Sequence, residues 1–394
     1  MLSSSFSASL ALALGCASLL TFSSAAPSPL KRNQPNIVPP AQLGAGGDPR
    51  NAGWNISQGY QPNSSYFVEK PTYQVFSNFD FQSIALALHQ EYIELDLFNY
   101  GLVKFSDADY DAAGIDAEDR HLIRHFAQQE IGHAVALSNM LGPNAPKMCS
   151  YRYDFQTVPE FIDFSQRLTK WGESGVYGFL NLLDNRASAQ ILLQSITTEA
   201  RQQFAFRQFE GLFPVPEWFE TGIPQSWAWT LLSPWIVSCP KENKPIAFEI
   251  YPALNWTNQP DAIAAGQAAG GPSISNNVTA LTSEGQENTF QWDYPGKTQG
   301  PYQQTTTTHT SGVPKFAAYV SQFNVTYAPL YDVDMDARTA KARQPGGKVY
   351  PEGPSLINST IFVALTSNDA HYTPANLTLI NNHVVAGPAI YQAG

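Results

Sequence analysis

The sequence predicts an α+β protein in which a four-helix bundle precedes a β-rich C-terminal domain, with a sandwich as the suggested form of that domain. Four segments between residues 78 and 211 place apolar residues at the 3.6-residue period of amphipathic helices. From Pro245 onward, short runs of β-branched and aromatic residues alternate with turn residues, which is typical of strands. Within the second helical segment, Glu130 and His133 are three residues apart and therefore share one helical face.

The N-terminal region has the pattern of a secretory signal. An apolar run from Leu10 to Leu20 is followed by small residues, which predicts a signal peptide over residues 1–26. The run is too short to span a bilayer and no later run reaches the required length, so we expect no membrane association after its removal rather than a retained anchor. Lys31-Arg32 predicts a dibasic processing site, and residues 27–65 are expected to form a propeptide or irregular linker.

Glycosylation motifs support a secreted or cell-wall location. The chain contains seven Asn-x-Ser/Thr sequons, which predict N-linked glycans on a secreted chain. None of them falls between Tyr66 and Leu254, as expected if this stretch is a compact helical bundle. The sequons are Asn55, Asn63, Asn255, Asn277, Asn324, Asn358 and Asn376.

Cysteine usage fits the same compartment. Of three cysteines, Cys16 would leave with the signal peptide, so Cys149 and Cys239 remain. In an oxidising compartment we expect them to form one disulfide, the alternative being two free buried thiols. Because the closed loop is long, such a bond would contribute about 4 kcal/mol in the chain-entropy model.

The charge balance argues against nucleic acid as a partner. The net charge is −11, only 14% of residues are charged, and no basic patch or arginine-rich run occurs. Proteins that bind nucleic acid concentrate lysine and arginine on one face.

The bundle and its extension are expected within residues 66–240. A polar, turn-prone connection is predicted at residues 107–114, and Gly142-Pro143 is a typical helix stop. Trp218, Trp227, Trp229 and Trp235 predict a packed extension over the bundle rather than a sugar-binding platform. The four helices are expected at residues 78–102, 116–141, 159–183 and 188–211.

The glycosylated β-rich domain is expected over residues 241–394. Its predicted strands are short and separated by turn residues, and Thr305–Thr308 is expected to be an exposed loop. The strands are predicted at residues 246–251, 290–294, 316–327, 360–365 and 377–385.

Each predicted helix directs one glutamate toward the common core. On helical wheels, Glu91, Glu130, Glu173 and Glu199 fall within apolar stripes, whereas Glu94 falls near a stripe edge. Unpaired buried carboxylates are strongly destabilising, and two divalent metal ions would neutralise four of them. Carboxylate and imidazole ligands suit iron or manganese. We therefore expect Glu130→Ala to abolish metal binding and Glu94→Ala to have little effect.

Four motifs resemble one known family. HQEYIELDLF, EIGHAVAL, WGESGVYGFLNLL and ITTEARQQFAFR are similar to the four helices of the ferritin-like family found in fungal stress-response and late-sexual-development proteins, and in plant desiccation-related proteins. The resemblance covers about residues 79–213. It implies metal ligands at Glu91, Glu130, His133, Glu173 and Glu199, with Gln202 at the position of a second histidine. Because an amide is a weak ligand, this departure predicts an asymmetric site with one metal ion, two unequal ions or none.

Two classes of function are compatible with this pattern. The first is a metal-dependent protein that handles O₂ or peroxide, which the four glutamates favour. The second is a structural or protective extracellular glycoprotein with a vestigial, metal-free site, which Gln202 and the glycan sites favour. An iron-storage cage is disfavoured because a glycosylated domain would have to lie on its shell. A serine hydrolase is disfavoured because the chain has no Gly-x-Ser-x-Gly motif.

Overall fold

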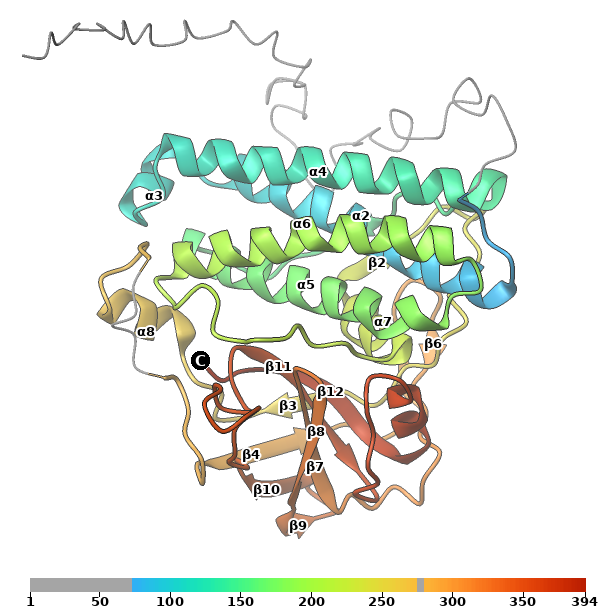
Figure 1. Cartoon of the computed structure of the whole chain (residues 1–394), viewed down its shortest axis with the longest axis vertical. Coiled ribbons are helices and arrows are strands. Elements are labelled where there is room, and N and C mark those ends of the chain that lie inside the picture. The colour runs from blue at the N-terminus through green and yellow to red at the C-terminus, as the bar shows by residue number, and fades with distance from the viewer. Residues whose placement is uncertain (1–72, 275–279) are drawn as a thin grey trace, which may run out of the picture.

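The computed structural model describes residues 73–274 and 280–394. It confirms the α+β class, with a helical part at one side and β-sheets at the other (Figure 1). The expected signal peptide, the processing site and the linker lie outside the described residues, as do Asn55, Asn63 and Asn277.

Four long helices form the helical layer. Helix α2 packs mainly against α4, and α5 packs against α6. All four lie within a few residues of the ranges expected from the sequence. Their bounds are α2 Asn78–Lys104, α4 Ala117–Leu141, α5 Val158–Phe179 and α6 Arg186–Glu210.

Side-chain caps explain where the long helices begin. Ser77, Asp116, Thr157 and Asn185 each accept a hydrogen bond from a free backbone N–H of the first turn. Helix α6 is capped at its C-terminus by Gly211, whose left-handed φ of 78° costs a glycine little.

The prediction of a turn-prone connection at residues 107–114 was wrong in part. A short helix, α3 (Asp107–Ala112), occupies most of it. Ser106 and Asp109 form a capping box that satisfies the first-turn amides, and Tyr110 packs into the core. The local acidic residues thus start a helix here rather than a loop.

The tryptophan-rich extension is mostly core. Trp227 and Trp229 lie in helix α7 (Gln225–Leu232) and are fully buried, while Trp235 is half-buried at the end of a 3₁₀ turn, η5 (Ser233–Trp235). These three confirm the predicted packed extension. Trp218 does not, because its side chain is 55% exposed.

The β-rich part contains two four-stranded antiparallel sheets. The inner sheet has the strand order β12-β11-β7-β8 and the outer sheet β3-β4-β10-β9. Inner strands are β7 Phe316–Ser321, β8 Asn324–Pro329, β11 Thr360–Thr366 and β12 Val384–Gln392. Outer strands are β3 Leu254–Trp256, β4 Glu287–Trp292, β9 Tyr331–Asp334 and β10 Thr339–Arg343.

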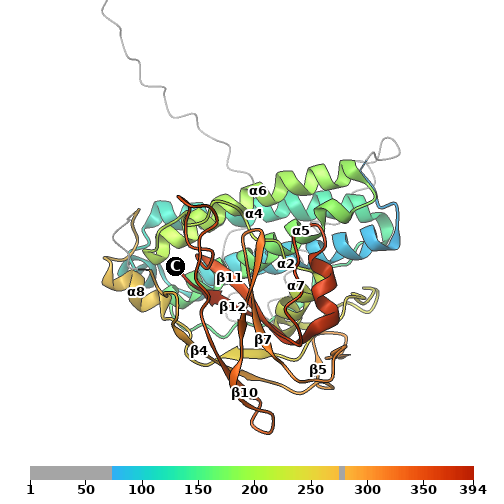
Figure 2. The same ribbon diagram turned by 60° about the horizontal axis from the view of Figure 1, so that its bottom comes forward.

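The inner sheet is buried on both faces. Along β11, Ile361, Val363 and Leu365 contribute to the core shared with the outer sheet, whereas Phe362 and Ala364 contribute to the core shared with the helices. This period of two follows from the pleat of a strand. The result is three layers, helices then inner sheet then outer sheet, which Figure 2 shows with the sheets brought forward.

Shorter elements complete the fold. Two small sheets pair β1 with β2 and β5 with β6. Their bounds and those of the remaining helices are β1 Ser150–Tyr151, β2 Ile236–Ser238, β5 Thr298–Gln299, β6 Gln304–Thr305, α8 Ala262–Ala268, η3 Gly142–Asn144, η4 Leu180–Leu182 and η6 Leu377–His383.

Two predicted strands were wrong. Residues 246–251 are irregular, although Ile246, Ile250 and Tyr251 are buried in the core. Residues 377–383 form the 3₁₀ helix η6, which buries Leu377 and Ile380, and β12 begins only at Val384. A spacing of three residues suits a 3₁₀ helix, so burial alone did not distinguish it from a strand.

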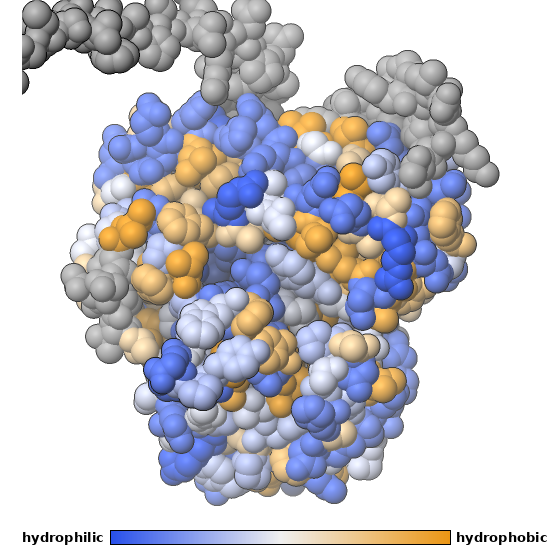
Figure 3. Space-filling model, viewed as in Figure 1, coloured by the Kyte–Doolittle hydropathy of each residue, from blue (hydrophilic) through white to orange (hydrophobic). Residues whose placement is uncertain are grey.

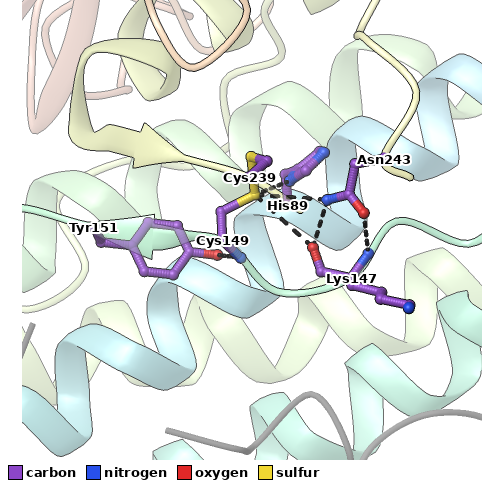
Figure 4. The surroundings of a disulfide bond; sticks show 6 residues. All are labelled: His89, Lys147, Cys149, Tyr151, Cys239 and Asn243. Atoms are coloured by element: carbon purple, nitrogen blue, oxygen red, sulfur yellow. Dashed lines mark hydrogen bonds between the residues drawn. A yellow bond between two sulfur atoms is a disulfide. The ribbon is translucent and has the colours of Figure 1, made fainter. Parts of the chain in front are cut away.

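The predicted disulfide between Cys149 and Cys239 is confirmed. It joins the two segments that carry β1 and β2, and Figure 4 shows His89 of α2 beside it. His89 is fully buried, and its Nδ1 lies 3.8 Å from the Cys149 Sγ atom. The cross-link therefore fastens the tryptophan-rich extension to the segment that leads into α5.

The surface in Figure 3 mixes hydrophobic and hydrophilic side chains, and the face drawn there is hollowed where the helical layer meets the sheets. Within residues 73–274 and 280–394, every helix lacks the combined length and apolar character needed to cross a lipid bilayer.

Candidate metal centre

Four side chains from three helices converge in the helical layer. Glu91 comes from α2, Glu130 and His133 from α4, and Glu199 from α6. Each offers one potential ligand atom, and these four atoms all lie within 4.8 Å of one another. The three glutamates are buried, and the His133 side chain is 11% exposed. The structure thus brings together four of the six residues that the sequence predicted as ligands.

His133 lies at the middle of the group. Its Nδ1 atom is 3.1 Å from Glu91 Oε2 and 3.0 Å from Glu130 Oε2. Glu199 Oε1 lies 3.8 Å from the same nitrogen. Three carboxylate oxygens from three helices therefore lie around one imidazole nitrogen.

The second nitrogen of His133 is held by a residue that the sequence reasoning missed. Thr198 Oγ1 donates its only proton to the Ser195 carbonyl, 2.7 Å away, and lies 3.1 Å from His133 Nε2. The hydroxyl oxygen must therefore accept a hydrogen bond from Nε2–H. This interaction orients the ring so that Nδ1 faces the carboxylates, which is how outer partners usually fix a histidine ligand. The sequence feature that could have indicated this role is the position of Thr198 directly before Glu199.

Gln202 lies beside the group and binds one of its members. Its Nε2 donates to Glu130 Oε1 at 2.5 Å and to Gln129 Oε1 at 3.2 Å. Its Oε1 is buried without a hydrogen-bond partner among the described residues. The amide thus engages the carboxylate oxygen of Glu130 that faces away from His133.

Glu173 is not one of the four converging residues. It is fully buried on α5, and the charges that act on it most strongly are those of Lys170, Glu220 and Glu217. Lys170 forms ion pairs with Glu217, at 2.9 Å, and with Glu220. An ammonium group therefore supplies the positive charge on this side of the bundle.

Glu94 was expected at the edge of the apolar stripe of α2, but the structure buries it in the core. It is 0% exposed, and its carboxylate accepts hydrogen bonds from Gln90 Nε2 at 2.7 Å and Thr169 Oγ1 at 3.3 Å. Burial raises its pKa well above the usual value, and the charges of Glu130 and Glu91 raise it further. The wheel assigned the wrong environment because the neighbouring helix α5 covers this edge.

The electrostatics of the group are those of a site that binds positive charge. Burial raises the pKa of Glu91 to about 8, although His133 opposes the shift. Burial alone would lower the pKa of His133, but Glu91 and Glu130 outweigh it and raise this pKa to about 12. Burial and the charge of Glu91 raise the pKa of Glu199 well above its usual value. Without a metal ion, protons must supply the compensating charge.

The donor set fits a divalent transition metal. Ligand atoms bound at about 2.1 Å from an ion are at most about 4.2 Å apart, so the observed cluster needs only a small contraction. Three carboxylates and one imidazole suit iron or manganese, among other divalent ions. The other close group of ligand-type atoms within the described residues, His89 with Cys149 and Cys239, has its two sulfurs joined in the disulfide.

Comparisons with known proteins agree with this architecture. A family model described as a ferritin-like domain matches residues 79–212, the segment that carries all four converging side chains. Protein rds1 of Schizosaccharomyces pombe (strain 972 / ATCC 24843) is 53% identical over 340 residues, which cover 82% of this chain and 83% of that protein. This chain therefore belongs to the fungal ferritin-like family that includes Protein rds1.

Proposed function

We propose that this protein is a secreted ferritin-like glycoprotein that binds one divalent transition metal ion, iron or manganese, in its helical layer. The ligands are Glu91, Glu130, His133 and Glu199. The observation that carries the proposal is the convergence of their ligand atoms within 4.8 Å, with Thr198 aiming Nδ1 of His133 at the carboxylates.

A single ion suits this chain better than a pair. A second ion beside the first would need Glu173 and an imidazole at position 202. Instead, Gln202 donates to Glu130 Oε1, and Lys170 supplies a positive charge near Glu173. Three carboxylates and a neutral imidazole then compensate one dication with little excess charge.

A bound iron or manganese ion would supply one-electron redox chemistry toward O₂ or peroxide. The chain's part is to hold the ligands in place and to exclude bulk water, because the three glutamates are buried. Glu94 lies close enough to raise the pKa of Glu199, and Gln90 and Thr169 hold its carboxylate in place. It can therefore retain a proton beside the ligands.

The metal content of the purified protein tests the proposal. The protein should be isolated from a secreting host and its iron, manganese and zinc quantified per chain. We expect about one equivalent in the wild type and a loss of at least about 100-fold in affinity for Glu130→Ala, which removes a ligand. Glu118→Ala, at an exposed position of the same helix, is the matched control. Less than about a tenth of an equivalent, not recovered on reconstitution, would rule the metal site out.

One observation favours the alternative of a structural, metal-free glycoprotein. His133 makes ion-pair contacts to Glu91 and Glu130, so a protonated imidazole can stand in for the metal ion. In that case the bundle should be equally stable with and without added Fe²⁺ or Mn²⁺. An increase in the unfolding temperature with metal concentration supports the metal-binding function instead.

A role in stress or development is part of the same proposal and comes from the motif resemblance. Secretion, glycosylation and a cell-wall or extracellular location follow from the signal-like N-terminus and the sequons. Detection of the protein in culture medium or a cell-wall fraction tests this part separately from the metal site.

A further inference from the structure

An exposed aromatic patch lies between the α6–α7 connection and the 350–353 turn. It consists of Trp218, Phe219 and Tyr350, which are exposed, and of Phe323, which is half-buried. Trp218 is 55% exposed and Tyr350 is 52% exposed. The rings of Phe219 and Phe323 are 4.7 Å apart at their centroids, and Phe219 lies 6.4 Å from Tyr350. Contiguous exposed apolar patches usually mark a contact surface.

The patch is fastened in place. The backbone N–H groups of Trp218 and Phe219 both donate to Gln322 Oε1, at 3.0 and 3.2 Å. Glu217, directly before Trp218, pairs with the buried Lys170 at 2.9 Å. The aromatic side chains are therefore held outward by fixed backbone, and their exposure is a property of the fold.

Two glycosylation sequons border this patch. Asn358 Nδ2 lies 2.7 Å from the carbonyl oxygen of Pro216, two residues before Trp218. Two residues of extended chain span at most about 7 Å. Asn324 directly follows Phe323 at the other side of the patch. The other sequons within the described residues, Asn255 and Asn376, are exposed and form no hydrogen bond with a residue of the patch.

We propose that the patch is covered by an N-linked glycan of this same chain, attached at Asn358. The first sugar rings would leave Asn358 beside Pro216 and lie on the face of Trp218. The C–H face of a pyranose ring is apolar and matches the face of an indole, while its hydroxyls remain in water. The proposal rests on passage through the secretory route, which is part of the proposed function.

The attachment point favours this occupant over a separate ligand. A tethered sugar meets the patch at high effective concentration, because its anchor adjoins the aromatic segment. The sugar would shield apolar surface that otherwise promotes association between molecules.

The test compares the same substitution with and without sugars. The chain should be produced by secretion from yeast and, without glycans, in an oxidising bacterial host. Mass spectrometry gives the occupancy at Asn358. We expect Trp218→Ala to lower the unfolding temperature by about 2–4 °C in the glycosylated protein and to change it little in the unglycosylated one. Tyr294→Ala, at an exposed aromatic residue outside the patch, is the control. It should change the unfolding temperature by the same amount in both forms.

In the yeast-made protein, Asn358→Gln should abolish the decrease in unfolding temperature that Trp218→Ala causes. Asn376→Gln should leave that decrease unchanged. Equal effects of Trp218→Ala in both forms would overturn the proposal. So would an unmodified Asn358 in protein that carries sugar at Asn255 or Asn376, and in that case secretion itself would stand. Absence of sugar at every sequon would reject both the proposal and the glycosylation that is part of the proposed function. Trp218-dependent binding of the unglycosylated protein to an insoluble polysaccharide would reassign the patch to an external ligand.

Discussion

The two ring nitrogens of His133 have different partners, carboxylates at Nδ1 and a threonine hydroxyl at Nε2. Nδ1 faces Glu91 and Glu130, and Nε2 donates to Thr198. This division decides which nitrogen can bind a metal ion. The Glu-x-x-His spacing indicated that His133 points into the bundle, but the tautomer depends on a threonine from another helix.

Removal of the Thr198 hydroxyl tests this division. Thr198→Val keeps the shape of the side chain but cannot accept the hydrogen bond from His133. We expect metal affinity to fall by about 10–100-fold, as is typical when an outer partner of a ligand is lost. Thr198→Ser should restore most of the affinity, and isothermal titration with Mn²⁺ measures both. Equal affinities in the wild type and Thr198→Val would show that the hydroxyl does not orient the ring.

Folding stability should depend on pH, because the pKa of Glu91 is raised to about 8 and that of His133 to about 12. With both values raised, the folded metal-free protein binds more protons than the unfolded chain, so stability must fall as pH rises. We expect a loss of roughly 1–3 kcal/mol between about pH 5 and pH 8.

Thermal or denaturant unfolding in the presence of a chelator measures this loss. Glu91→Gln, which stays neutral, should flatten the curve, and saturation with Mn²⁺ should reverse it because metal binding displaces protons. A wild-type curve that matches Glu91→Gln at every pH would contradict the assignment.

At the scale of elements, close helix approach depends on particular glycines. In α5, a Cβ atom at Gly178 would lie 1.8 Å from the carbonyl oxygen of Ile223, which precedes α7. In α4, a Cβ atom at Gly132 would meet no atom within 4 Å. The same residue type therefore has a packing role in one helix and none in the other.

The two glycines make a matched pair of substitutions. Gly178→Ala should destabilise the protein by about 3 kcal/mol or more, because a backbone oxygen cannot move aside easily. Gly132→Ala should stabilise it by roughly 0.5–1 kcal/mol through the lower conformational entropy of alanine in the unfolded chain. Denaturant unfolding measures both. Similar effects at the two positions would show that the approach of Ile223 to α5 is not tight.

At the scale of the whole molecule, helices and sheets are joined by shared cores and polar contacts. The inner sheet contributes Phe362 and Ala364 to the helical core. Gln166 of α5 and Thr360 of β11 are buried and hydrogen-bonded at 2.9 Å. The β-rich part therefore stabilises the helical layer directly.

The disulfide adds a covalent link to this arrangement. Cys149 and Cys239 are 90 residues apart in the sequence, so the cross-link removes much entropy from the unfolded chain. Replacing both cysteines by serine should cost about 4 kcal/mol in the chain-entropy model. Metal content should be retained, because the bond faces His89 and the ligand on α2 is Glu91. A variant as stable as the wild type in urea would contradict this expectation.

The sequence by itself determined the four helices, the sheet-rich C-terminal part, the disulfide pair and the convergence of Glu91, Glu130, His133 and Glu199. Each of these depends on a local period, a cap or the pairing of the two cysteines outside the expected signal peptide. Only the tertiary structure decided the placement of Glu94, Thr198, Glu173 and Trp218. Their environments are set by neighbouring elements. Helix α5 covers Glu94, the charges of Lys170 and Glu220 act on Glu173, and Gln322 in the β7–β8 turn holds the backbone of Trp218. A helical wheel describes one helix, whereas burial and charge depend on which elements pack beside it.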